Sequence, residues 1–189
     1  MRFLFLMGLT GCSGALVPFT LDSGVEDLAN DTDVVAAVED TDDPSALLRL
    51  NEVVSTNDRS YEDLETGEFP DWIELSVVGL DAVDLTGWTL SDSGTEAPLD
   101  GLVAPGASFV VLSADDGAAD GPLHLPFKLS SSAEVVTLRA PGGVFVDAVM
   151  WSADGMGPYG PQQVDESLAR QADDGWDHDG SPTPGAAND

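Results

Sequence analysis

The chain has 189 residues, of which 42% are hydrophobic, and this is enough for one core of ordinary domain size. It carries 35 Asp and Glu residues against only 6 Lys and Arg residues, so its formal net charge is -29. This charge excludes nucleic acid as a partner, because affinity for a phosphate backbone depends on Lys and Arg. It favours cations, basic partners or simple solubility.

The sequence contains one cysteine, Cys12, and two histidines, His124 and His178. A single cysteine forms no internal disulfide, no CxxC redox pair and no cysteine-rich zinc site. Two histidines are too few for a His-rich metal site. Carboxylate chemistry remains, but in so acidic a chain a pair of carboxylates identifies no activity by itself.

The first residues follow the order of an export signal. Arg2 precedes an apolar run over residues 3–9, and small residues then lead to Cys12. The stretch Leu9–Cys12 resembles the lipobox of bacterial lipoproteins, in which the cysteine is acylated and the signal is cut before it. The alternative is a short buried strand over residues 3–9, with the cysteine as a small apolar filler.

The lipobox resemblance implies a signal peptide over residues 1–11 and a mature protein anchored to a lipid bilayer through acylated Cys12. Ser13, rather than Asp, follows the cysteine. This resembles the pattern of lipoproteins that reach the outer membrane, so we expect an anchored protein of the bacterial cell envelope, at the outer membrane or cell surface.

The composition of residues 12–45 predicts an acidic, disordered tether. From Asp22 to Asp43 the segment is rich in acids and has no Lys or Arg and no aromatic residue. It cannot bury enough apolar surface to offset its chain entropy. Charged linkers repel themselves and extend, so the tether would hold the following domain away from the membrane.

Residues 46–189 predict an all-β domain, because short apolar runs alternate with turn sequences and no amphipathic helix competes. Pro141-Gly142-Gly143 lies between two of these runs and predicts a hairpin. The expected strands are Leu47–Val54, Trp72–Val78, Trp88–Leu90, Ser108–Ser113, Glu134–Leu138 and Val144–Trp151.

Four phrases resemble, in order, those of the bacterial lamin-tail domain: LNEVV (50–54), DWIEL (71–75), DLTGWTLSD (84–92) and TPGAAN (183–188). Shorter phrases at 124–130, 134–138, 147–149 and 165–170 also fall in the family's order. The resemblance covers about residues 46–188. It implies an immunoglobulin-like β-sandwich that acts as a non-catalytic interaction or targeting module on exported proteins.

Two tryptophans, Trp72 and Trp88, are expected in the structural core. Each brings a large apolar area to a predicted strand, and in a sandwich such rings normally fill the space between the sheets. A role as a platform for a ligand is the alternative.

Two glutamates in the strand phrases, Glu52 and Glu74, suggest a different function. Alternation along the strands puts Glu52 in phase with Leu50 and Glu74 in phase with Trp72, so both carboxylates are expected near the core. Two such acids can act as an acid–base pair in a hydrolase. The structural interpretation, favoured here, is that they meet backbone amides, water or an arginine, for which Arg49, Arg59 and Arg170 are the candidates.

Two acid-rich segments suggest calcium. In one, Asp177 and Asp179 alternate before Gly180, although the Glu that completes an EF-hand loop is missing. The other contains Asp115 and Asp116. A simple Asp/Gly turn is the competing interpretation of both segments. His124 lies in a Pro-flanked loop, where a packed or solvated histidine is more common than a ligand.

The sequence therefore predicts a lipid-anchored, non-catalytic interaction module that binds an unknown protein or other surface partner and needs no cofactor. The first alternative is an adhesin that binds carbohydrate or matrix and depends on calcium. The second is a small hydrolase that uses Glu52, Glu74 or Asp71.

Overall fold

The computed structural model describes residues 43–115 and 121–189. The signal peptide, Cys12, most of the tether and Asp116 lie outside these residues, so the expectations placed on them stay predictions. Within the described ranges, no helix is long and apolar enough to cross a bilayer.

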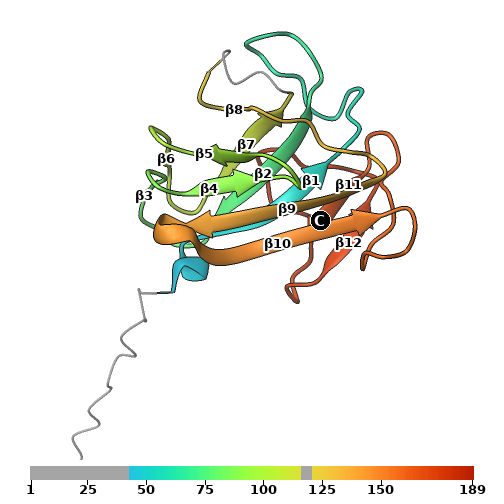
Figure 1. Ribbon diagram of the computed structural model, residues 1–189. Helices are drawn as coiled ribbons and strands as arrows, with labels where there is room; N and C mark the ends of the chain where they lie inside the picture. The colour runs from blue at the N-terminus through green and yellow to red at the C-terminus, as the bar shows by residue number, and fades with distance from the viewer. Residues whose placement is uncertain (1–42, 116–120) are drawn as a thin grey trace, which may run out of the picture. The chain divides into compact units, whose positions relative to one another are not determined.

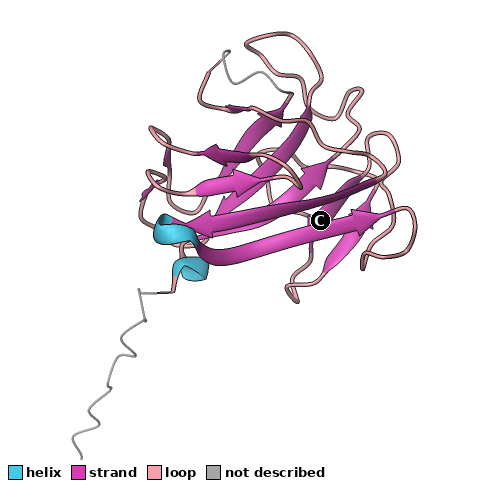
Figure 2. Cartoon of the chain, in the orientation of Figure 1, coloured by secondary structure: helices cyan, strands magenta, loops and turns pink. Residues whose placement is uncertain are grey.

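The domain is all-β, as the sequence predicts, and two sheets pack face to face as a β-sandwich (Figures 1 and 2). The larger sheet has the order β12-β11-β1-β2-β7-β8, the smaller has the order β10-β9-β4-β5, and β3 pairs with β6 separately. All pairings are antiparallel except that of β7 with β8. The larger sheet consists of β1 (Leu48–Val54), β2 (Asp71–Val77), β7 (Phe109–Ala114), β8 (His124–Leu125), β11 (Ser167–Arg170) and β12 (Trp176–Asp179).

The smaller sheet contains the hairpin that the sequence predicts. Its strands β9 (Ala133–Ala140) and β10 (Val144–Ser152) are joined by the short 3-10 turn η2 (Pro141–Gly143). Gly142 has a φ of 79°, which explains the glycine there. The remaining elements are β4 (Thr89–Ser91), β5 (Glu96–Pro98), the pair β3 (Val83–Asp84) and β6 (Val103–Ala104), and the 3-10 turn η1 (Pro44–Ala46).

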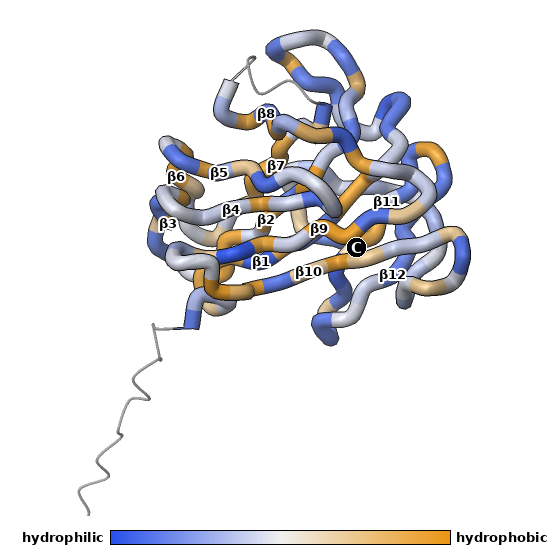
Figure 3. Tube along the Cα trace, in the orientation of Figure 1, coloured by the Kyte–Doolittle hydropathy of each residue, from blue (hydrophilic) through white to orange (hydrophobic). Residues whose placement is uncertain are grey.

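The core lies between the two sheets and takes every second side chain from their strands. In β9, the buried residues Val136 and Leu138 alternate with half-buried Val135 and Thr137. Hydrophobic stretches accordingly follow the facing strands, while the loops are mostly hydrophilic (Figure 3). Such alternation is what a sandwich requires, because only one face of each sheet meets the other.

Both predicted core tryptophans are buried, but they occupy different places. Trp88 is 3% exposed and belongs to the cluster between the sheets. Trp72 is fully buried on the opposite face of β2, because Ile73 and Leu75 take the inward positions. The expectation that Trp72 fills the space between the sheets is therefore wrong. The ring lies under the β1–β2 loop, tilted against Tyr61 at a centroid distance of 6.1 Å.

A β-bulge corrects a second expectation. The register of β1 against β2 shifts between Leu50 and Glu52, so Leu50 and Val53 both face the core. Glu52 therefore leaves the phase of Leu50 and pairs across the strands with Glu74 on the outer face. One inserted residue reverses the face of every position after it, and simple alternation misses this.

Candidate functional site

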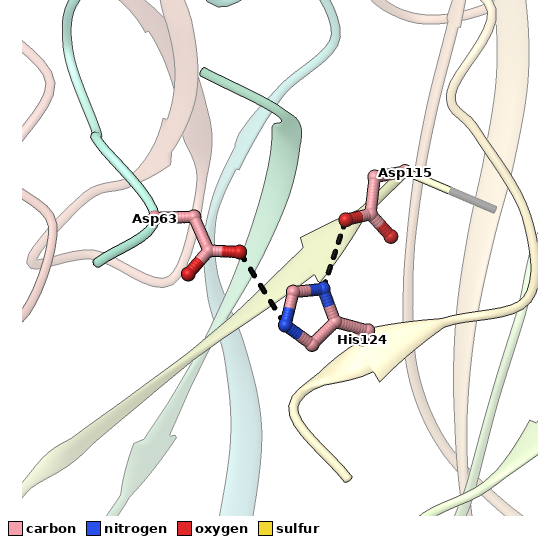
Figure 4. Close-up of side chains that lie close together, drawn as sticks. All are labelled: Asp63, Asp115 and His124. Carbon is pink, nitrogen blue, oxygen red and sulfur yellow. Dashed lines mark hydrogen bonds and ion pairs between the residues drawn. The ribbon is translucent and has the colours of Figure 1, made fainter. Parts of the chain in front are cut away.

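Two groups of acidic side chains have the features of a site, and they lie in different parts of the larger sheet. The first is the carboxylate pair Glu52 and Glu74, at the centre of its outer face. The second is an acid–imidazole group around His124, at one end of the sheet (Figure 4). The first pair accepts hydrogen bonds from neutral donors, whereas the acids of the second group contact an imidazole.

The last residues of the chain cover the carboxylate pair. Both glutamates are 0% exposed. Glu74 accepts hydrogen bonds from Asn51 Nδ2 at 2.6 Å and from the Gly185 N–H at 2.5 Å. Glu52 accepts from Ser167 Oγ at 2.6 Å and from the Thr183 N–H at 3.1 Å. All of these donors are neutral, and two of them belong to the C-terminal segment 183–188.

Burial without a cationic partner favours the protonated form of these acids. Burial raises the pKa of Glu74 to about 7, the hydrogen bonds from Gly185 and Asn51 oppose this rise, and the charge of Glu52 adds to it. Burial likewise raises the pKa of Glu52. The three arginines named as candidate partners form ion pairs elsewhere: Arg49 with Asp174, Arg59 with Asp165 and Arg170 with Asp147.

Asp71 completes the acids proposed for a hydrolase, and it faces away from the other two. It lies in phase with Ile73 in β2, on the side opposite Glu74. Burial raises the pKa of Asp71 to about 6, while backbone hydrogen bonds from Asn57 and Leu129 oppose the rise. The three acids thus surround no common cleft, and their raised pKa values follow from burial.

One loop and the ends of two strands bring the second group together. Asp63 belongs to the β1–β2 loop, Asp115 follows β7 directly, and His124 begins β8. Since β2, β7 and β8 are neighbours in the larger sheet, these segments meet at one end of it. Figure 4 shows the imidazole of His124 between the two aspartates.

The two nitrogens of His124 have different contacts. Nδ1 lies 2.8 Å from Asp115 Oδ2, the length of a strong hydrogen bond, and must carry the proton because an ionised carboxylate only accepts. Nε2 lies 3.3 Å from Asp63 Oδ2 and 3.7 Å from Glu65 Oε2. The imidazole is 1% exposed, whereas the side chain of Glu65 is 62% exposed.

Next to His124 lie a carboxylate held by hydrogen bonds and a cavity. Asp63 accepts hydrogen bonds from the Glu65 N–H at 2.9 Å and from Thr66 Oγ1 at 3.1 Å, which fixes its carboxylate. A cavity of about 330 Å³ lies beside the group and is lined by His124, Asp63, Tyr61, Ser113 and neighbouring side chains. Asp63, Asp115 and His124 can each offer one ligand atom within 4.8 Å of the other two.

The acids predicted to bind calcium are placed differently. Asp177 and Asp179 lie in strand β12, where the sequence suggested a loop or turn, and they accept hydrogen bonds from His178 N and Ser181 N. Asp115 joins Asp63 and His124 instead. Neither Asp63 nor Glu65 was singled out from the sequence, and His124 was interpreted as a packed or solvated residue. His124 is indeed buried, but it is buried between carboxylates.

No family model matches the chain, and neither a curated protein nor a solved structure matches it. The resemblance to the lamin-tail domain therefore rests on the sequence phrases alone.

Proposed function

We propose that this chain is a lipid-anchored, non-catalytic binding module of the bacterial cell envelope, whose lamin-tail-like sandwich binds a protein or another surface partner. The observation that carries the proposal is the sealing of Glu52 and Glu74, the acids best suited to hydrolysis. Both have 0% exposure, and they accept hydrogen bonds from backbone N–H groups of the C-terminal segment. A general acid must reach its substrate, and these carboxylates do not reach the surface.

The direction of the strands supports binding of a partner at the end of the domain that contains His124. The segment that precedes the domain joins it at η1, next to Leu48 at the start of β1. The β1–β2 loop and His124 lie at the other end of the sheet, where β1 ends and β7 reaches Ala114. Figure 1 shows η1 and β8 at opposite ends of the sandwich. The preceding chain therefore enters the domain at the end opposite His124.

Fatty-acid labelling tests the anchor. The full chain, expressed in a bacterium with an outer membrane, is labelled with radioactive palmitate as wild type and as Cys12→Ala. We expect label and membrane fractionation in the wild type, loss of both in Cys12→Ala, and no change in the control Ser13→Ala. Equal labelling of wild type and Cys12→Ala contradicts the anchor.

Site-specific photo-crosslinking tests which end binds. Leu64, in the β1–β2 loop, and Leu80, at the η1 end, are 90% and 89% exposed and form a matched pair. A photoreactive amino acid is placed at either position in the anchored protein on intact cells. We expect discrete crosslinked products from position 64 and few from position 80. Equal products from both positions, or none, count against binding at the end that contains His124.

A further inference from the structure

The contacts of His124 contain two kinds of distance, and only one kind is a hydrogen bond. The 2.8 Å between Nδ1 and Asp115 is a hydrogen-bond length. The 3.3 and 3.7 Å from Nε2 to Asp63 and Glu65 are longer than the usual N–H···O range. They match instead the spacing between ligands in a tetrahedral metal site, about 3.4 Å for bonds of about 2.1 Å.

We propose that Asp63, Glu65 and His124 bind one divalent transition-metal ion, for which Zn²⁺ is the probe. Nε2 of His124 and one carboxylate oxygen from each acid would be the protein ligands. The site belongs to the folded domain and does not depend on acylation of Cys12, so it stands or falls separately from the proposed anchor.

Asp115 has a positioning role in this arrangement. Histidines that bind metal through one nitrogen commonly donate from the other to a carboxylate, which fixes the tautomer and makes the ligand more basic. The hydrogen bond from Nδ1 to Asp115 Oδ2 has this form. Asp63 is oriented in the same way by the Glu65 N–H and Thr66 Oγ1.

The donor set selects the class of ion. One imidazole with carboxylates suits zinc and its first-row neighbours, whereas calcium takes six to eight oxygen ligands in a looser shell. Asp63 and His124 are almost completely buried, which limits rearrangement around a larger ion. Three carboxylates around one imidazole also leave an excess of negative charge, which a divalent cation offsets.

The remaining coordination position has room for another ligand. The cavity of about 330 Å³ adjoins the imidazole, and it accommodates a water molecule or a donor group from a partner. Such an open position distinguishes this proposal from a closed structural site, which four protein ligands complete.

The experiment uses the full chain with Cys12→Ser, so that no thiol contributes ligands. After treatment with a chelator, the protein is titrated with Co²⁺ and then with Zn²⁺ at about 0.15 M salt. Excess Mg²⁺ is present to occupy the many surface acids. We expect one Co²⁺ per chain, with the visible absorption of a four- or five-coordinate N/O site, and displacement of Co²⁺ by Zn²⁺.

Matched variants locate the site. We expect His124→Gln to abolish the Co²⁺ spectrum, while His178→Gln, the other histidine, leaves it unchanged. Asp115→Asn should weaken Zn²⁺ binding about 10- to 100-fold, the usual effect of removing a group that orients a ligand. Glu65→Gln should not disturb the fold, because the side chain of Glu65 is largely exposed. We expect it to weaken Zn²⁺ binding by at least about tenfold.

Three outcomes overturn the proposal. The first is no saturable binding of Co²⁺ or Zn²⁺ in the presence of Mg²⁺. The second is binding that His124→Gln and Glu65→Gln leave unchanged in variants that retain the wild-type circular dichroism spectrum. The third is equal displacement of Co²⁺ by Ca²⁺ and by Zn²⁺, which would identify an unselective acidic surface.

Discussion

The two acidic groups of this domain differ in what compensates their charge. Among the residues that the structure describes, Glu52 and Glu74 accept hydrogen bonds only from neutral N–H, O–H and amide donors, and the C-terminal segment covers them. Asp63 and Asp115 meet an imidazole beside a cavity. The first arrangement uses every carboxylate oxygen to hold the chain together. The second places Nε2 of His124 beside Asp63 and Glu65, where we propose that a cation binds.

Their positions in the sheet explain the difference. The glutamates project from the middle of neighbouring strands, whose spacing the backbone ladder fixes, so a terminal segment can lie across them. The His124 group is assembled from loop residues and strand ends. Loops positioned by a rigid scaffold are the usual location of binding residues. In this very acidic chain, the informative acids are therefore those that meet an imidazole.

Removing Glu74 should have the largest effect on stability. Glu74→Leu removes the acceptor of the Gly185 N–H and one of the two acceptors of Asn51 Nδ2, which keeps its bond to Asn188 Oδ1, so one N–H of each donor loses its acceptor in a buried place. Each such group costs about 1–3 kcal/mol, so we expect the free energy of unfolding to fall by about 3 kcal/mol or more. Urea denaturation followed by tryptophan fluorescence measures it.

Glu96→Leu is the matched control for this experiment, because Glu96 is an exposed glutamate in strand β5. We expect it to change the free energy of unfolding by no more than about 0.5 kcal/mol. A similar loss in both variants would show that Glu74 holds nothing in place, and the contrast between the two acidic groups would fail.

The glutamate pair should also make stability depend on pH. The pKa of Glu74 is about 7 in the folded chain against an ordinary value of 4.5, so between these values the folded state holds a proton that the unfolded state has released. The contribution of Glu74 to the free energy of unfolding is therefore fully present below about pH 4.5 and is lost as the pH rises through 7. The loss is about 3 kcal/mol for Glu74 alone.

Glu74→Gln isolates this effect, because the amide stays neutral at every pH. We expect the fall in stability between pH 4.5 and 8 to be clearly smaller in Glu74→Gln than in the wild type. A remaining slope should reflect Glu52 and Asp71, whose pKa values burial also raises. Identical pH profiles of variant and wild type would contradict a raised pKa at Glu74.

The sequence predicted the all-β class, the Pro141-Gly142-Gly143 hairpin and most of the longer strands, because these depend on local alternation and turn residues. It missed short strands such as β8 and β12. They have only a few residues, and their pairing comes from neighbours distant in the chain. It also misplaced Glu52, because a bulge leaves no mark in an alternating pattern.

The His124 group was beyond sequence reasoning for a related reason. Strands β2 to β7 lie between Asp63 and His124 in the sequence, and the two residues meet only because β2, β7 and β8 are neighbours in one sheet. Neither residue belongs to a motif of fixed spacing. Asp115 was a candidate metal ligand, but its expected companion was Asp116, a sequence neighbour. Contacts of this kind depend on strand order, which a single sequence does not specify.

Two glycine substitutions should have the smallest effect on stability, and comparing them distinguishes an effect on the His124 group from an effect of backbone strain. Gly121 has a φ of 145°, and an added Cβ would lie 3.4 Å from Glu65 Oε2 and 3.7 Å from His124 Cδ2. Gly142 has a φ of 79°, with open space around the same position. Alanine at either site should destabilise the fold by about 1–2 kcal/mol, because both backbone conformations disfavour a side chain.

Only Gly121→Ala should affect the metal. Its methyl group occupies space beside Glu65, so we expect Zn²⁺ affinity to fall about tenfold, as for other groups that surround a ligand. Gly142→Ala, which also places an alanine at a positive φ but far from the site, should bind Zn²⁺ as the wild type does. If both variants lose affinity in proportion to their loss of stability, the metal effect reports general loosening of the fold. Loss in Gly121→Ala alone ties the bound ion to the side of the imidazole that faces Glu65.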